Sequence, residues 1–263
     1  MTDLRGRRAV VTGGSAGLGL AIVQALRDAQ AEVTAIARDD DGLATARYAG
    51  ANTIAGDATD ANLIARVVAE REPDVLILNA GAQPPMASID EQTWEGFSST
   101  WDTDVRATFV GIQAALGTPM RPGTRVMAMS SGAAMVLSHP AITPRDLRLS
   151  GGYVGAKRMI WFMAHQANAV SEERGLDIHF QVLVPGQLIG STKLGRQVAL
   201  AYAEIEGVSV DEHIVQRYGS HLQPSQIGRQ VARLIVDPQY GSGVAYGFRA
   251  DAPILPFDLQ GRE

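Results

Sequence analysis

The chain has 263 residues, a formal net charge of −5 and no cysteine, and 46% of its residues are hydrophobic. This size and composition predict one soluble α/β domain over residues 1–263. The acidic balance argues against a nucleic-acid or anionic-membrane surface, and the lack of cysteine excludes disulfides and thiolate chemistry. No apolar stretch has the length of a signal peptide or a spanning helix, so we expect a cytoplasmic protein with no membrane partner.

Short apolar segments alternate along the chain with segments of helical periodicity. The expected strands are Arg8–Thr12, Glu32–Ala37, Asn52–Ala55, Asp74–Leu78, Thr124–Met129, Asp177–Val184 and Gly243–Phe248. The expected helices are Leu18–Ala29, Asn62–Glu70, Trp94–Leu116, Tyr153–Arg174 and Ser225–Val236. Apolar strands separated by helices predict a Rossmann-like, doubly wound parallel sheet of about seven strands, with helices on both faces.

Two stretches interrupt this alternation, and both follow the carboxyl end of a strand. Residues 132–152 form a long loop that contains His139, Arg145 and Arg148, for which we expect positions on the surface. Residues 190–223 carry a helical pattern outside the regular alternation. Open α/β sheets bind ligands at the carboxyl ends of their strands. We therefore expect a pocket wall in the first stretch and a helical lid at about 190–223.

A glycine-rich turn, Thr12-Gly-Gly-Ser-Ala-Gly-Leu-Gly19, joins the first strand to the first helix. Small residues let the backbone approach a pyrophosphate, and N–H groups at a helix N-terminus favour an anion. A tight turn without a ligand could contain the same glycines. The position directly between a strand and a helix favours the nucleotide.

Tyr153 and Lys157 are four residues apart on an expected helix and so lie on one face of it. An isolated tyrosine has a pKa of about 10, which makes it a poor acid–base catalyst at neutral pH. A nearby ammonium group stabilises the phenolate and lowers that pKa. The spacing is common on helices, so the pair gains meaning only together with the glycine-rich turn.

The spacing Thr-Gly-x-x-x-Gly-x-Gly at residues 12–19 resembles the signature of the short-chain dehydrogenase/reductase family. Further family motifs recur in the expected order over nearly the whole chain: Asp57, Asn79-Ala80-Gly81, Ser131, Tyr153-x-x-x-Lys157 and Pro185-Gly186. An ordered set of this kind is far more specific than any one motif.

The resemblance implies a cofactor site and favours NADP(H) over NAD(H). Family members that use NAD carry an acidic residue at the end of the second strand, where this chain has Ala37 followed by Arg38. A guanidinium suits a phosphate, whereas Arg38 as an ordinary surface residue would leave the ribose to Asp39. The implied cofactor-binding residues are Gly13, Ser15, Gly17, Leu18, Gly19, Arg38, Asp57, Ala58, Asn79, Ala80, Gly81, Tyr153, Lys157, Pro185, Gly186 and Thr192. Near the last of these, Ser191 is an alternative to Thr192, and no metal is expected.

The resemblance also implies a catalytic set of Ser131, Tyr153 and Lys157, with Asp104 as a departure. The family has an asparagine where Trp101-Asp-Thr-Asp104 places an aspartate. Its charge would partly offset the potential of Lys157 at the phenol, so we expect an active enzyme with an altered pH profile. Asp104 could instead be turned away from the lysine. A further departure is Arg249-Ala-Asp-Ala-Pro253, which stands where the family has a closing Gly-Gly.

Together these features predict an NADP(H)-dependent carbonyl reductase or alcohol dehydrogenase. The expected substrate is a mid-sized, largely apolar ketone or secondary alcohol, and the family implies a homodimer or homotetramer. One alternative is a catalytically impaired nucleotide-binding sensor or scaffold of the same fold, which Asp104 alone favours. A third hypothesis is an epimerase, which would keep the cofactor and use it in a hidden redox cycle.

Overall fold

The computed structural model describes residues 2–135, 148–219, 222–250 and 252–257. Its sheet has the strand order β3-β2-β1-β4-β5-β6-β7-β8, parallel except for the antiparallel pair of β7 and β8. The strands are β1 (Arg8–Thr12), β2 (Glu32–Ala37), β3 (Asn52–Ala55), β4 (Val75–Leu78), β5 (Thr124–Met129), β6 (Ile178–Pro185), β7 (Ala245–Phe248) and β8 (Leu255–Phe257). This is the predicted Rossmann-like sheet with one additional strand.

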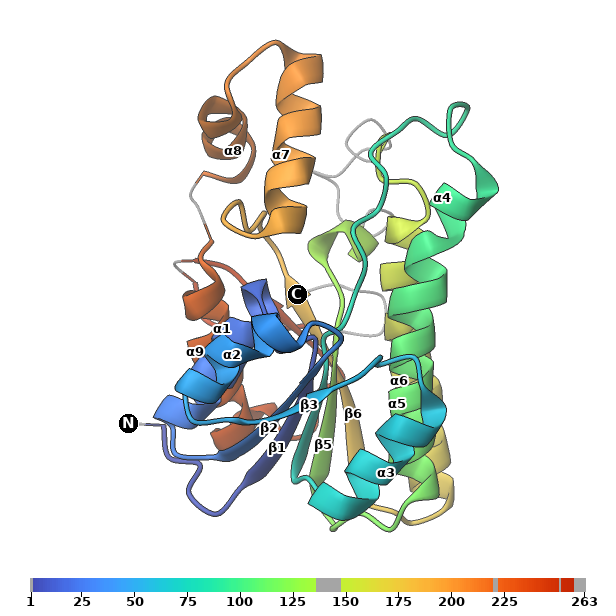
Figure 1. The fold of residues 1–263 in the computed structure, drawn as a ribbon, viewed down its shortest axis with the longest axis vertical. Coiled ribbons are helices and arrows are strands. Elements are labelled where there is room, and N and C mark those ends of the chain that lie inside the picture. The colour runs from blue at the N-terminus through green and yellow to red at the C-terminus, as the bar shows by residue number, and fades with distance from the viewer. Residues whose placement is uncertain (1, 136–147, 220–221, 251, 258–263) are drawn as a thin grey trace.

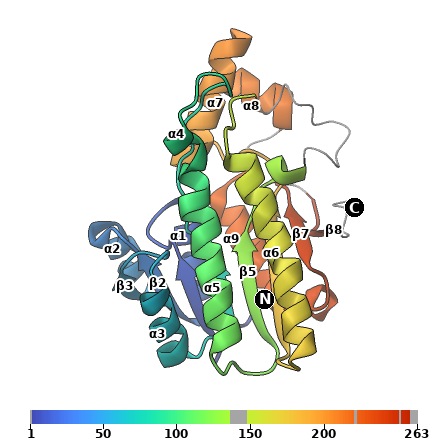
Figure 2. The same cartoon turned by 90° about the vertical axis from the view of Figure 1, so that its right-hand side faces the viewer.

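Helices cover both faces of the sheet (Figures 1 and 2). They are α1 (Gly17–Asp28), α2 (Asp40–Tyr48), α3 (Ala61–Arg71), α4 (Trp94–Thr100), α5 (Arg106–Gly117), α6 (Tyr153–Glu173), α7 (Lys193–Glu206), α8 (Val210–Tyr218) and α9 (Pro224–Val236). Helices α1 and α9 pack together on one face, and α3, α5 and α6 lie on the other. The pair α7 and α8 stands beyond the sheet in Figure 1.

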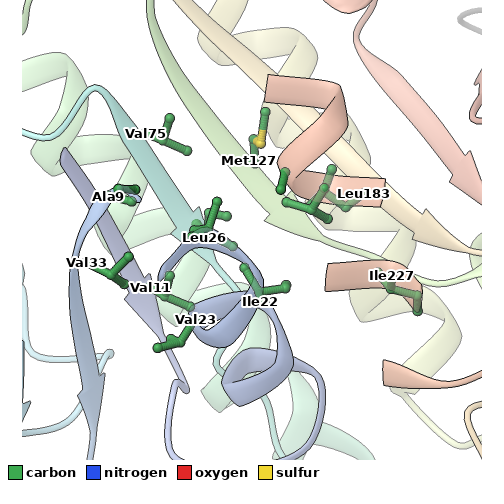
Figure 3. Packing of buried hydrophobic residues seen from close by; sticks show 14 of the residues in the cluster. Ala9, Val11, Ile22, Val23, Leu26, Val33, Val75, Met127, Leu183 and Ile227 are labelled. Carbon is green, nitrogen blue, oxygen red and sulfur yellow. The ribbon is translucent and has the colours of Figure 1, made fainter. Parts of the chain in front are cut away.

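Neighbouring residues of a strand point to opposite faces of the sheet and pack into different hydrophobic cores. In β1, Ala9 and Val11 belong to the cluster beneath α1 and α9, which also contains Ile22 of α1 and Ile227 of α9 (Figure 3). Val10, between them, belongs to the cluster beneath α3, α5 and α6. Because strand side chains alternate between faces, a strand that is apolar throughout serves two cores.

The structure adds one α-helix and one strand to the sequence expectation, and one expected helix is divided. The additional elements are α2 and β8. The helix expected over Trp94–Leu116 consists of α4, a π-helical turn at Trp101–Val105, and α5. A π-turn adds one residue to a helical turn, which shifts the following side chains around the helix axis. This turn contains Asp104.

The side chain of Arg125 joins strand β6, the end of helix α9 and the turn at Tyr240. Its side chain is buried and donates to the Gln181 side chain and to the carbonyl oxygens of Leu234, Ile235 and Tyr240. Burial lowers the pKa of Arg125 to about 10. Two of these carbonyl groups belong to the last turn of α9, whose free acceptors favour a cation.

We expect Arg125→Met to lower the free energy of unfolding by about 2–4 kcal/mol, because it leaves buried carbonyl groups without a donor. Urea denaturation followed by circular dichroism measures the change. Arg125→Lys is the matched variant, since it keeps the charge and loses the planar donor fork. A methionine variant as stable as the wild type would show that the arginine contributes no net stability.

Candidate active site

The strand register aligns the carboxyl ends of six strands at one edge of the sheet. Thr12 pairs with Ile36 and with Leu78, and the series continues through Met129 and Pro185 across the neighbouring strands. The residues that directly follow these ends are Gly13, Arg38, Asn79, Ser130, Gly186 and Arg249. Because parallel strands end at a common edge, residues distant in sequence form one row.

A cavity of about 910 Å³ lies along this edge, between the strand ends and the α7–α8 pair. All the residues predicted for the cofactor and for catalysis line it: Gly13, Ser15, Gly17, Leu18, Gly19, Arg38, Asp57, Ala58, Asn79, Ala80, Gly81, Asp104, Ser131, Tyr153, Lys157, Pro185, Gly186 and Thr192. The structure thus gathers the whole predicted set around one space. What that set binds remains a prediction.

The glycine-rich turn requires its glycines for conformation and for space. Gly13 has φ +68° and Gly17 has φ +54°, a region that L side chains rarely adopt. A Cβ on Gly13 would lie 2.9 Å from the Cα of Ala80, and one on Gly19 would lie 2.1 Å from the carbonyl oxygen of Gly13. The turn therefore packs against the end of β4 and directs the N-terminus of α1 into the cavity.

Asn79 joins the ends of β1 and β4. Its backbone N–H donates to Thr12 Oγ1 at 3.0 Å, and its side-chain amide donates to the carbonyl oxygens of Thr12 and Gly13 at 3.2 and 3.3 Å. These bonds fix the floor of the cavity at the crevice where the strand order reverses, the usual ligand position in such sheets.

Arg38 and Asp57 stand at the β2–β3 end of the cavity. Arg38 is exposed, and Asp39 directly precedes α2 without a side-chain bond to its N-terminus. The carboxylate of Asp57 accepts bonds from the N–H and hydroxyl of Thr59, at 2.8 and 2.9 Å. The backbone N–H of Thr59, followed by its hydroxyl and by Arg38, holds the pKa of Asp57 below its usual value despite partial burial. This end therefore carries a cation beside a well-anchored carboxylate.

Asp104 faces Lys157, so the alternative in which it turns away is wrong. The lysine Nζ lies 2.9 Å from Asp104 Oδ2 and donates to the carbonyl oxygen of Met129 at 3.1 Å. The other oxygen, Oδ1, accepts from the backbone N–H of Ala82 at 2.7 Å. Gly81 leaves room for this carboxylate, because a Cβ there would lie 2.9 Å from Oδ2.

The ion pair is buried, with 5% of Lys157 and 1% of Asp104 exposed. Burial lowers the pKa of Lys157, but the charges of Asp104 and Tyr153 outweigh that effect and raise its pKa above the ordinary value. The ammonium Nζ lies 5.6 Å from the centre of the Tyr153 ring. An amine whose charged form is favoured therefore lies beside the phenol, and the Asp104 carboxylate is its ion-pair partner.

The two serines at the end of β5 have different surroundings. Ser130 is buried, and its hydroxyl donates to the carbonyl oxygen of Lys157 at 2.8 Å. Ser131 is partly exposed and lines the cavity, where its hydroxyl accepts from the backbone N–H of Ala133 at 3.2 Å. That bond leaves the hydroxyl proton of Ser131 able to donate. The distinction agrees with the predicted choice of Ser131 over Ser130.

Thr192 is the N-cap of α7. Its hydroxyl accepts from Gly195 N–H at 3.0 Å and donates to the Ile189 carbonyl oxygen at 2.8 Å. A Cβ on Gly17 would lie 3.6 Å from Thr192 Cγ2, so α7 begins directly opposite the glycine-rich turn. The alternative residue, Ser191, is exposed.

Several cavity-lining residues lay outside the predicted site set. They are Gln83, Met86, Met135, Ser150, Gln187, Tyr202, Arg217, Tyr218, Arg249, Leu255 and Phe257. Met135 and Ser150 lie in the expected pocket-wall loop, Gln187 follows a strand end, Tyr202, Arg217 and Tyr218 lie in the expected lid, and Arg249 stood out as a departure from the family pattern. In the loop at 132–152, Arg148 is exposed, whereas His139 and Arg145 lie outside the described residues.

Comparison with known proteins decides the family. The family model described as "short chain dehydrogenase" matches residues 7–143. The chain belongs to the short-chain dehydrogenase family. It is 31% identical to a Streptomyces antibioticus protein named as a probable oxidoreductase, over 85% of this chain and 78% of that one. It is 25% identical to L-fucose dehydrogenase of Rattus norvegicus, over 95% of this chain and 97% of the relative.

Solved structures of short-chain dehydrogenases share the fold. A Burkholderia cenocepacia J2315 short-chain dehydrogenase in complex with NADP superposes with a TM-score of 0.71 at 23% identity, covering 95% of this chain and 98% of the other. The family match and the Streptomyces antibioticus relative show that the chain is an oxidoreductase of this family. No helix in the described part of the chain is long and apolar enough to cross a membrane, and no three His, Asp or Glu side chains there converge as metal ligands.

Proposed function

We propose that this short-chain dehydrogenase uses NADP(H) to interconvert a carbonyl group and an alcohol. The observation that carries the proposal is the single cavity in which the Tyr153–Lys157 pair and Ser131 face the glycine-rich turn. When bound, the nicotinamide supplies a hydride for reduction or accepts one in oxidation. The described residues do the rest: they bind, orient and move a proton.

The cavity has the features that a dinucleotide requires. The crowded positions of Gly13 and Gly19 show a backbone with no room for side chains, and the N-termini of α1 and α7 both open into the same space. Such N-termini favour a pyrophosphate. Asp57 is suited to the adenine amino group and Lys157 to the nicotinamide ribose. The structural neighbour from Burkholderia cenocepacia, whose complex contains NADP, supports this proposal.

In reduction, Tyr153 gives its phenolic proton to the developing alkoxide, and solvent returns a proton to the phenolate. With the hydride that a bound nicotinamide would supply, this single proton from Tyr153 completes the alcohol. Ser131 orients the substrate oxygen by donating a hydrogen bond. Lys157 stabilises the phenolate. We propose that residues 190–223, which include α7 and α8, form the lid over the substrate.

The preference for NADP(H) rests on Arg38, exposed at the end of β2. We expect Arg38→Ala to weaken NADPH binding about tenfold or more and to change NADH binding less than threefold, because the guanidinium contacts only the additional phosphate. Titration followed by nicotinamide fluorescence measures both dissociation constants, with Arg229→Ala on α9 as a control for net charge. A wild-type protein that prefers NADH would assign the ribose contact to Asp39.

The second candidate function is a nucleotide sensor of the same fold without turnover, which Asp104 alone favours. The retention of Ser131, Tyr153 and Lys157 on one cavity wall supports the enzyme. We further propose a cytoplasmic homodimer or homotetramer. Exposed Phe109 on α5 and Phe162 on α6, neighbouring helices in Figure 2, support association through this face.

A further inference from the structure

Gln187 joins two segments of the chain that each contribute an arginine to the cavity lining. Its buried side chain donates to the carbonyl oxygen of Tyr218 at 2.8 Å and accepts from the backbone N–H of Ala250 at 2.7 Å. These two partners end helix α8 and follow strand β7. Each is preceded by an arginine, Arg217 and Arg249, and both arginines line the cavity. One amide side chain thus fixes the segments that carry both cations.

Arg249 lies at the catalytic end of the cavity. The Cγ of Arg249 is 3.5 Å from the position of a Cβ on Gly186. Gly186 also contacts Gly132: a Cβ added to Gly132 would lie 3.3 Å from the Cα of Gly186. Gly132 directly follows the proposed catalytic Ser131 in the sequence. Arg38 lies toward the other end of the row of strands, because β1, β4, β5 and β6 separate β2 from β7. Arg249 is therefore placed for a substrate and away from the adenosine end.

Among the described residues that line this end of the cavity, Arg249 has a positively charged side chain and no carboxylate is paired with it. The carboxylates among the described cavity-lining residues are Asp39, Asp57 and Asp104. The first two belong to the β2–β3 end, and the third is paired with Lys157. The cavity lining also includes Leu188 and the β8 residues Leu255 and Phe257, which are apolar. A guanidinium on a partly apolar wall suits a carboxylate or phosphate, because its planar fork can donate two parallel hydrogen bonds.

We propose that the substrate carries an oxyanion, a carboxylate or a phosphate ester, which Arg249 binds with support from Arg217 while the carbonyl group meets Ser131 and Tyr153. This inference rests on the proposed function and specifies its substrate class. It revises the expectation of a largely apolar substrate: the body is apolar, and one end is anionic. Arg249 is then a specificity-determining residue, in the segment that departs from the closing Gly-Gly of the family.

Matched pairs of probes test the proposal. 4-Oxopentanoate and its methyl ester form a carboxylate pair, and dihydroxyacetone phosphate and dihydroxyacetone form a phosphate pair. Binding to the NADP⁺-loaded protein is measured by calorimetry, and NADPH-dependent reduction is measured for each compound. The variants are Arg249→Gln and Arg217→Gln, with Arg229→Gln as the control because this exposed residue on α9 is absent from the cavity wall.

We expect the charged member of at least one pair to bind about tenfold or more tightly than its neutral partner. Arg249→Gln should remove most of that preference, because charge-assisted hydrogen bonds contribute a factor of this size. The dissociation constant of NADPH in Arg249→Gln should stay within about twofold of the wild-type value. In Arg229→Gln, the dissociation constants of all four probes should also stay within about twofold of the wild-type values. The pair that responds distinguishes a carboxylate from a phosphate.

Two results would overturn this inference and leave the proposed function standing: no preference for a charged probe, or a preference that survives in Arg249→Gln. Weakened NADPH binding in Arg249→Gln, with the charged-to-neutral ratio unchanged, would also overturn it by assigning the arginine to the cofactor. Failure of the wild type to bind either nicotinamide nucleotide would instead reject the proposed function.

Discussion

Replacing Tyr153 with phenylalanine is expected to lower kcat for carbonyl reduction by a factor of about 10² to 10⁴. The substitution removes one hydroxyl, the proposed proton donor, and keeps the ring that packs on α6 beside Lys157. Binding of NADPH should change little, since Lys157, Asn79 and the glycine-rich turn remain. The expected pattern is a fall in kcat at an almost unchanged dissociation constant for the cofactor.

The measurement is steady-state NADPH oxidation with any carbonyl compound that the wild type reduces, alongside fluorescence titration of the cofactor. Tyr48→Phe is the matched control: it makes the same chemical change at a side chain that is 95% exposed on α2 and does not line the cavity. A Tyr153→Phe variant that keeps more than about a tenth of the wild-type kcat would reject the role of the phenol.

Replacing Asp104 with asparagine should move the pH profile of alcohol oxidation to lower pH by about one unit or more. In the proposed mechanism, oxidation requires the phenolate of Tyr153, and the Lys157 ammonium favours that phenolate. The Asp104 carboxylate, 2.9 Å from the lysine Nζ, opposes this effect. Without the carboxylate the positive potential at the phenol increases, so the phenolate forms at lower pH. The increase in oxidation rate with rising pH therefore begins at a lower pH.

The same substitution affects the lysine and the stability of the fold. The carboxylate is what raises the pKa of buried Lys157 against the effect of burial, so that pKa falls in Asp104→Asn. A buried ammonium without its counterion should also lower the free energy of unfolding, by about 3 kcal/mol. The asparagine keeps an oxygen that can accept from Ala82 N–H, which limits the structural change.

Asp102→Asn is the control for this experiment, because Asp102 is an exposed aspartate on the same π-helical turn and accepts a hydrogen bond from Ser98. Rates of alcohol oxidation are measured from about pH 6 to pH 10 in the wild type and in both variants. A profile that stays in place in Asp104→Asn, or that shifts equally in Asp102→Asn, would contradict the electrostatic role of the buried pair.

The sequence predicted the strand ends and their motif residues because each depends on local chemistry. Gly13 and Gly17 have positive φ, and the apolar strands serve two cores, so patterns of residue type alone identify them. The register then brings Ser131, Pro185 and Asn79 to one edge without further information. For this reason the whole predicted site set lies around one cavity.

The remaining elements depend on contacts that local patterns do not encode. Helix α2 buries only Leu43 and Ala46, which is too weak a periodicity to detect. Strand β8 has three residues with Pro256 at its centre, a residue excluded from interior strands but tolerated at an edge. The π-helical turn differs from an α-helix by one residue, which an average periodicity conceals.

The functional residues that the sequence left open are those set by tertiary placement. Asp104 could point toward or away from Lys157, and only the π-helical turn packed against α6 orients it toward the amine. Arg249 was visible only as a departure from the family pattern. Its position beside Gly186 depends on the Gln187 side chain, whose partners are 31 and 63 residues away along the chain.

The most direct test of the proposed reaction is transfer of deuterium from NADPH labelled at nicotinamide C4 to a panel of carbonyl compounds, detected by mass spectrometry of the products. The label is followed from both faces of the ring, in the wild type and in Tyr153→Phe. We expect deuterium on the carbinol carbon of at least one product in the wild type, and almost none in the variant. A wild-type protein that binds NADPH yet transfers no label to any carbonyl compound would contradict the proposed enzyme and support the nucleotide sensor.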